Sequence, residues 1–161
     1  MTAPFLPFTR PSIDEETIAD VVAVLKGGWI TSGPRVASFE QALSAYLGGR
    51  MVRSMTSATG GMEMALKVLG VGPGDEVIVP AMTFAASANV VERLGARAVF
   101  VDVELRSRNV TAAAMEAAIT TRTKVLMPVH FSGLAVEMDE VLDLERILIR
   151  PRAVEDHPVP P

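Results

Sequence analysis

The stretch "GPGDEVIVPAMTFAASANVV", from Gly72 to Val91, decides the fold class. Its first four residues, "GPGD", have the composition of a tight turn. Glu76–Val79 follows as a short, mostly apolar run typical of a buried strand, and a proline closes it. Phe84–Leu94 then has the pattern of a helix. A strand that leads directly into a helix is the beginning of a βαβ unit, so this stretch predicts a parallel α/β sheet.

The same alternation continues on both sides of this stretch. Strands and helices of this length imply right-handed βαβ crossovers. Hydrophobic residues make up 49% of the chain and aromatic residues only 5%, so the core is aliphatic, as in a parallel sheet covered by helices on both faces. We therefore expect an α/β fold with three layers. The other predicted strands are Met51–Met55, Ala96–Val103 and Lys124–Val129, and the other helices are Thr59–Leu69, Thr111–Ile119 and Met138 to about Arg146.

Two helices are predicted ahead of the alternating region. Ser12 and Glu15 have the spacing of a capping box, and Gly27 and the glycine after it end the first helical pattern. The loop "GGWITSGP" follows, and Pro34 suits the first turn of a second helix, which ends near Gly48.

Composition excludes several classes of function. The net charge is −4 and no basic cluster occurs, so nucleic acid and acidic membrane surfaces are not expected partners. The chain has no cysteine, which excludes disulfides and cysteine nucleophiles. Its two histidines lack spaced carboxylates, so no metal site is expected. The first residues do not resemble a signal peptide and no apolar run has membrane-spanning length, which favours the cytoplasm.

The segment "TSATGG", from Thr56 to Gly61, lies between a predicted strand and a predicted helix. This arrangement places free backbone N–H groups and the positive end of a helix dipole at the carboxyl edge of the sheet. Ser57 and Thr59 can add hydroxyl donors, so the segment can hold a phosphate. A well-capped helix with a tight loop is the alternative interpretation. The segment is neither a Walker loop nor a GxGxxG dinucleotide motif.

Phe84 stands at the start of the next helix, beside this segment in any βαβ arrangement. It can lie flat on a planar ring whose phosphate sits at Ser57–Thr59. The alternative interpretation is a core aromatic residue at a helix start.

These motifs together resemble the DegT/DnrJ/EryC1/StrS family of pyridoxal-phosphate (PLP) sugar aminotransferases. The resemblance extends over about residues 4 to 145 and rests on "RPSI", "GWITSGP", "SATGGM", "GPGDEVIVPAMTFAASANVV", "FVDV", "AAITTRTKVLMPVHFSG" and "MDEVL". It implies the large domain of the aspartate-aminotransferase (type I PLP) fold, here incomplete. It also implies that Ser57, Ala58 and Thr59 bind the phosphate of PLP and that Phe84 stacks on its pyridine ring.

The resemblance further implies nucleotide-linked keto sugars as substrates and glutamate or glutamine as amino donor. It implies a homodimer, with the "GWITSGP" loop near the active site at the subunit interface. In the family a strand ending "VEDAAHA" carries the aspartate that pairs with the pyridine nitrogen. The segment "AVEDHPVPP" keeps three of these residues, so Asp156 is the candidate here, the alternative being an acidic residue in a solvated tail.

PLP transamination needs a lysine that holds the cofactor and moves a proton. Lys26, Lys67 and Lys124 are the only lysines, and none matches the family's catalytic lysine. We therefore expect no catalytic residue in this chain. Residues 146–161 change in composition, with three arginines and four prolines. We therefore divide the chain into a large-domain part (1–145) and a divergent tail (146–161), without the small C-terminal domain. A truncation or frame change near residue 145 would explain this.

Two other functions stay open at this point. The chain could be a non-catalytic dimerising or interaction protein derived from the family. It could also derive from a related dehydratase that uses pyridoxamine phosphate, in which histidine replaces the lysine. His130, in "PVHFSG", suits a structural or substrate-side role better than catalysis. Asp75 and Glu76 are expected to face solvent or to cap helices.

Overall fold

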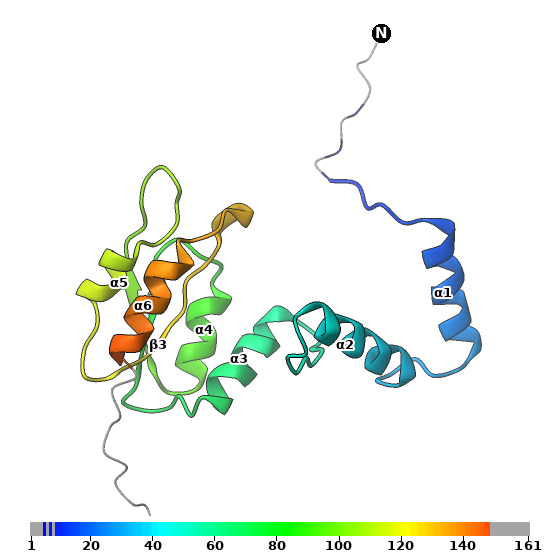
Figure 1. Cartoon of the computed structure of the whole chain (residues 1–161), viewed down its shortest axis with the longest axis horizontal. Coiled ribbons are helices and arrows are strands. Elements are labelled where there is room, and N and C mark those ends of the chain that lie inside the picture. Colours follow the sequence, from blue (N-terminus) through cyan, green and yellow to red (C-terminus); the bar gives the residue numbers. More distant parts are fainter. Residues whose placement is uncertain (1–4, 6, 8, 149–161) are drawn as a thin grey trace, which may run out of the picture. The chain divides into compact units, whose positions relative to one another are not determined.

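The computed structural model describes residues 5, 7 and 9–148, and it divides into two compact units, Met1–Ser54 and Met55–Pro161. The first unit holds α1 (Glu15–Lys26) and α2 (Pro34–Tyr46) (Figure 1). Pro34 opens α2, as predicted. The cap of α1 differs from the prediction, because Asp14 and not Ser12 is the N-cap. Its carboxylate accepts a hydrogen bond from the backbone N–H of Thr17 at 2.8 Å, which satisfies one of the free donors of the first turn.

The loop between α1 and α2 is organised around its tryptophan. The Trp29 indole N–H donates to the carbonyl oxygen of Ser32 at 2.9 Å, which folds the ring back over the loop. A Cβ atom at Gly33 would lie only 2.3 Å from the indole nitrogen, so this contact requires a glycine. A cavity of about 380 Å³ lies between this loop and the ends of the two helices.

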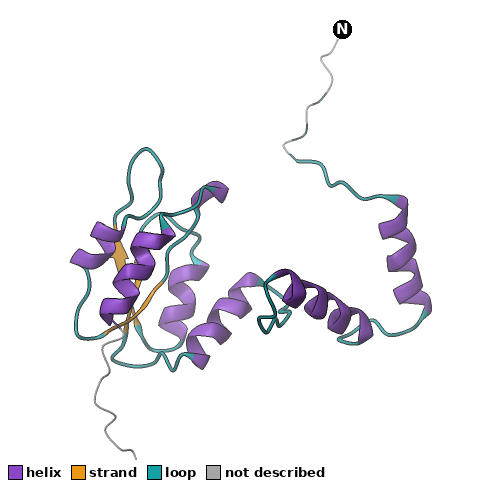
Figure 2. Ribbon diagram, in the orientation of Figure 1, coloured by secondary structure: helices purple, strands orange, loops and turns teal. Residues whose placement is uncertain are grey.

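The second unit contains a parallel three-stranded sheet in the order β2-β1-β3. All five residues of β1 are buried, because a neighbouring strand flanks it on each side and helices cover both faces (Figure 2). The elements, in chain order, are α3 (Ala58–Val68), β1 (Glu76–Pro80), α4 (Ala86–Arg93), β2 (Arg97–Val101), α5 (Ala112–Ala117), β3 (Thr123–Leu126), a 3-10 turn (Phe131–Gly133) and α6 (Met138–Leu148).

Two apolar clusters, one on each face of the sheet, form the core. Val77 and Val79 of β1 pack on one side with residues of α3 and α4. Ile78 faces the other side and packs with residues of α5 and α6, among them Met115. Alternate residues of a strand point to opposite faces, so these clusters confirm the predicted three-layer α/β architecture. Gly95, at φ +74°, ends α4 as expected of a glycine after a helix.

The strand predicted at Met51–Met55 is wrong. This segment has no strand pairing among the described residues, and the N–H of Ser54 donates to a carboxylate oxygen of Glu40 at 2.7 Å instead. A β-strand forms only where it hydrogen-bonds to a neighbouring strand, and the residue pattern of a short segment does not show whether such a neighbour is present.

The strands β2 and β3 are shorter than predicted at their carboxyl ends. After β2 the N–H of Val103 donates to the Asp102 carboxylate at 2.9 Å, which replaces a ladder bond. After β3 the N–H of Met127 still donates to the carbonyl of Ile78, but Pro128 has no N–H to continue the ladder.

Candidate functional site

The start of α3 carries the first part of the candidate site. Ser57 is the N-cap, with extended backbone, and its hydroxyl oxygen accepts a hydrogen bond from the N–H of Gly60 at 3.1 Å. The Ser57 carbonyl accepts from Gly61 at 3.0 Å. Within the described part of the chain, the N–H groups of Ala58 and Thr59 have no protein acceptor, and both residues are exposed. These two donors and the helix dipole make the start of α3 suitable for an anion.

The start of α4 carries the second part. Phe84 lies between β1 and α4, two residues before the helix begins, and it is 79% exposed. It therefore does not belong to the core, contrary to the alternative interpretation of this residue. The hydroxyl groups of Thr83 and Ser87 lie 2.8 Å apart, and Ser87 is buried, so this pair fixes the turn from which Phe84 projects.

Both helix starts lie at the same edge of the sheet. The three strands are parallel, so the segments that follow β1, β2 and β3 all leave at the carboxyl edge. Helices α3 and α4 pack on the same face of the sheet, and each leads into the amino end of the strand that follows it. Both helices therefore start toward the carboxyl edge. In open α/β sheets, ligands bind in the crevice outside this edge. The structure thus places the predicted phosphate segment at the start of α3, and Phe84 just before the start of the neighbouring helix α4, at one edge of the sheet. Asp156 lies outside the described residues.

The lysines of the second unit lie away from this edge. Lys67 is in the last turn of α3, about 13 Å along the helix axis from Ala58. Lys124, at the start of β3, donates to the carbonyl of Gly70 at 2.6 Å and to the carboxylate of Asp75 at 3.0 Å. Both side chains therefore belong to the opposite, amino edge of the sheet. Lys26 belongs to the first unit.

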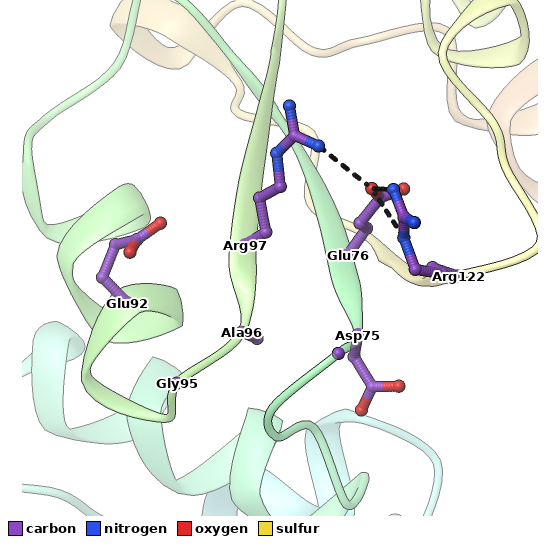
Figure 3. Close-up of a pocket in the computed structure, with 8 residues that line it drawn as sticks. Asp75, Glu76, Glu92, Gly95, Ala96, Arg97 and Arg122 are labelled. Carbon is purple, nitrogen blue, oxygen red and sulfur yellow. Dashed lines mark hydrogen bonds and ion pairs between the residues drawn. The ribbon is translucent and has the colours of Figure 1, made fainter.

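The amino edge has a charged cluster that the sequence analysis missed. Glu76 is only 2% exposed, and this corrects the expectation that it faces solvent or caps a helix. Its carboxylate accepts a hydrogen bond from the hydroxyl of Thr120. It also accepts hydrogen bonds from two nitrogens of Arg122, at 2.7 and 3.1 Å, and a nitrogen of Arg97 lies at 3.5 Å (Figure 3). The Thr120 hydrogen bond, and after it the Arg122 guanidinium, lower the pKa of Glu76.

A cavity of about 420 Å³ lies beside this cluster, lined by Glu76, Arg97, Arg122 and neighbouring residues (Figure 3). Charges of both signs line it, and the interactions among them satisfy the carboxylate of Glu76. Because it lies at the opposite edge from the starts of α3 and α4, we assign this cluster to stability. The sequence signal was the position of Glu76 at the beginning of a fully buried strand, where a charge needs partners.

A further group of side chains lies at the carboxyl edge beyond β2 and β3. Asn109 is buried, and its amide joins the loop after β2 to the segment after β3. His130 Nδ1 accepts a hydrogen bond from the N–H of Val136 at 3.0 Å. The described residues contain no cluster of three or more potential metal-binding side chains and no helix long and apolar enough to cross a membrane.

The fold is an α/β domain with a parallel sheet and two helices that start at one edge of it, and comparison with known proteins identifies the family. Residues 11–147 match the model of the DegT/DnrJ/EryC1/StrS aminotransferase family. The chain belongs to this family, which confirms the resemblance in the sequence.

Among curated relatives, the chain is 45% identical over 144 residues to the UDP-4-amino-4-deoxy-L-arabinose–oxoglutarate aminotransferase of Shewanella sediminis. The match covers 89% of this chain and 37% of that enzyme. Among solved structures, 3-amino-5-hydroxybenzoic acid synthase has a TM-score of 0.82 at 41% identity, with 91% of this chain and 38% of that chain covered.

NtdA of Bacillus subtilis, solved with bound cofactor PMP, has a TM-score of 0.78 at 34% identity, with coverages of 84% and 32%. The chain thus spans between about a third and two fifths of the length of these relatives. These likenesses confirm the predicted fold class, in which the parallel sheet is part of the large domain of the type I fold.

Proposed function

We propose that this chain carries the cofactor-binding edge of a PLP-dependent aminotransferase that acts on nucleotide-linked keto sugars. One observation carries the proposal: two neighbouring helices start at one sheet edge, one with free N–H groups at Ala58 and Thr59 and one preceded by the exposed Phe84. An anionic group and a flat ring in one ligand match these two features, and PLP combines both. When bound, PLP supplies an electron sink for the substrate carbon.

In this proposal each side chain has a separate task. Ser57 uses its hydroxyl to cap Gly60, so the N–H groups of Ala58 and Thr59 are left to donate to phosphate oxygens. Phe84 presents its ring face to the pyridine and limits the access of water to that side. Asp156, which lies outside the described residues, is proposed to keep the pyridine nitrogen protonated.

The names of the relatives support the substrate class and the cofactor. The Shewanella sediminis enzyme is named for a UDP-linked amino sugar and for oxoglutarate, and NtdA was solved with PMP. We therefore propose a nucleotide sugar as amino acceptor, with glutamate or glutamine as donor, in a homodimer in the cytoplasm. Since Lys67 and Lys124 lie at the amino edge, we propose that this chain by itself does not catalyse amino transfer.

The substitution Ala58→Pro tests the proposal directly. Ala58 is the first residue of α3, where proline is favoured, and Ser57 already has the extended backbone (φ −159°, ψ 157°) that the residue before proline needs. The substitution thus removes one N–H donor and keeps the helix. We expect the affinity for PLP, measured by calorimetry, to fall about tenfold, because a hydrogen bond to a charged group is lost.

Two controls separate this effect from a general disturbance. Ala112→Pro makes the same change at the first residue of α5, away from the site, and should leave PLP affinity unchanged. Pyridoxal, which lacks the phosphate, should bind more weakly than PLP and should not distinguish Ala58→Pro from the parent chain. Equal affinity of the parent and the Ala58→Pro variant for PLP would refute the assignment of the phosphate to α3.

A further inference from the structure

The side chain of Asn109 clamps two loops together at the carboxyl edge. Asn109 is 5% exposed, and its amide nitrogen donates to the carbonyl oxygens of Leu134 and Ala135 at 2.9 and 3.1 Å. Its amide oxygen accepts from the N–H of Phe131 at 2.9 Å. Each of these bonds runs from the loop after β2 to the segment after β3, so a single buried side chain fixes the geometry of both.

The backbone beside the clamp adopts an unfavourable conformation. Arg108 (φ 60°) and Ser132 (φ 52°) are the only non-glycine residues with positive φ among those the structure describes. Arg108 precedes Asn109, and Ser132 follows Phe131, so both flank residues that the clamp joins. Left-handed backbone in such residues costs free energy and persists where surrounding contacts enforce it, often at ligand-binding sites.

The side chain of Arg108 lies against the ring of Phe131, one of the residues that Asn109 binds. The Arg108 guanidinium carbon lies 5.9 Å from the centroid of the Phe131 ring, close enough for a cation–π contact. In the described part of the chain Arg108 has no carboxylate partner, whereas Arg122 and Arg97 are paired with Glu76. Stacking orders the guanidinium without neutralising it, and an ordered, uncompensated guanidinium is well suited to a phosphate or carboxylate.

His130 adds a neutral donor on the segment after β3. Val136 donates its N–H to Nδ1 of His130, so Nδ1 has no proton and the ring proton sits on Nε2. His130 is exposed, and Nε2 has no partner among the described residues. The hydrogen bond between Phe131 and Asn109 joins the residues that follow His130 and Arg108 in the chain, so both side chains leave the backbone at one junction.

We propose that Arg108 and His130 form an oxyanion-binding site for the substrate, with the guanidinium and the Nε2–H of the imidazole as donors. This inference rests on the proposed function, which places the substrate at the same edge. The oxyanion belongs either to the diphosphate of the nucleotide sugar or to a carboxylate of the amino donor. The chemistry is the same in both cases, and two probes distinguish them: UDP for the first source and 2-oxoglutarate for the second.

Nitrogen-15 NMR of the full chain tests the site. The chain has two histidines, so His157→Gln leaves His130 as the only imidazole and serves as the parent for all measurements. We expect its spectrum to show the Nε2–H form. Addition of UDP or 2-oxoglutarate at millimolar concentration should then shift the Nε2–H signal in a saturable way.

Matched arginine variants make the test specific. Arg108→Gln should weaken the binding of the active probe about tenfold, because a charge-assisted pair of hydrogen bonds is lost. Arg106→Gln removes the same charge from the same loop, without the contact to Phe131, and should change the affinity less than about twofold. An Nδ1–H form of His130, no shift with either probe, or equal effects of the two arginine variants overturns the inference.

The same spectra separate this inference from the function on which it rests. PLP binding is read from the backbone amide signals of Ala58 and Thr59. If those signals shift with PLP while the His130 signal shifts with neither probe, the proposal of the oxyanion site is refuted and the proposed function stands. If the His130 signal shifts with UDP or 2-oxoglutarate while the amide signals of Ala58 and Thr59 do not shift with PLP, the proposed cofactor assignment is refuted instead.

Discussion

Glu76 shows how a buried charge can stabilise the start of a strand. A buried carboxylate loses its hydration, and this cost is offset only when hydrogen bonds and opposite charge replace the water. Thr120 and Arg122 supply the hydrogen bonds from the turn before β3, and Arg97 adds a charge from β2. The carboxylate therefore links all three strands at their amino ends.

The lowered pKa of Glu76 predicts how stability depends on pH. A carboxyl group whose pKa is lower in the folded chain stabilises it above the unfolded value, 4.5, and this contribution is lost as the pH falls through the folded pKa. Glu76→Gln should therefore lower the midpoint of thermal unfolding by several degrees at pH 7. The difference between variant and parent should shrink as the pH falls below 4.5. Calorimetry or circular dichroism at a series of pH values measures this.

A matched exposed carboxylate provides the control for Glu76. Glu116 lies exposed on α5, so Glu116→Gln removes the same charge without disturbing the cluster and should hardly change the midpoint. Asp14 and Glu40 also have lowered pKa values, so the parent loses stability in acid for several reasons. Only the difference in unfolding midpoint between Glu76→Gln and the parent reports the contribution of Glu76. A difference that stays constant from pH 7 to below 4 would contradict the stabilising role assigned to the ionised carboxylate.

At the scale of elements, the "GWITSGP" loop depends on the contact between Trp29 and Gly33. The backbone of Gly33 is extended and would accept alanine, so a substitution there acts only through the collision of the new Cβ with the indole. Gly33→Ala should displace the ring, break its hydrogen bond to Ser32 and shift the emission of Trp29, the only tryptophan in the chain. Steady-state fluorescence measures the shift.

The control for this loop is a glycine with free space around it. A Cβ at Gly72 would meet no atom within 4 Å, so Gly72→Ala should leave the emission of Trp29 unchanged. Unfolding midpoints should differ little for Gly33→Ala, because the Trp29 side chain is 61% exposed and contributes little burial. Identical emission spectra for Gly33→Ala and the parent would show that the indole does not rest on Gly33.

Local sequence patterns predict some elements of this chain better than others. The strand at Glu76 and the helix after Ser57 are strongly predicted because burial, turn residues and caps all agree there. The segment Met51–Met55 has a residue pattern compatible with a strand and no partner among the described residues, and such long-range pairing is not encoded in a short stretch. The cap at Asp14 was missed because Ser12 offers an equally plausible local pattern.

At the scale of the whole molecule, the position of a site can be predicted from the sequence when each of its residues stands at the start or end of one helix or strand. The predicted phosphate segment and Phe84 each stand at the start of a helix, so their positions follow from the βα order alone. The Asn109 clamp and the Glu76 cluster join residues more than twenty positions apart in the chain, and only the folded structure brings them together. Both were missed for this reason, and both fix the geometry of the sheet edges.

The first unit carries an apolar surface that predicts self-association. None of the residues of α1 is buried, and Ile18, Val21 and Leu25, on one face of the helix, are 45%, 55% and 63% exposed. Contiguous exposed apolar surface of this kind favours association. In line with the proposed homodimer, we expect the chain to sediment as a dimer at micromolar concentration. Val21→Glu should shift it toward monomer, because the new charge would lose its hydration in the interface.

Ala23→Glu places the same charge on the opposite side of α1 and should leave the dimer intact. Analytical ultracentrifugation distinguishes these outcomes, and a parent chain that is monomeric at every concentration would show that this face does not pair two copies.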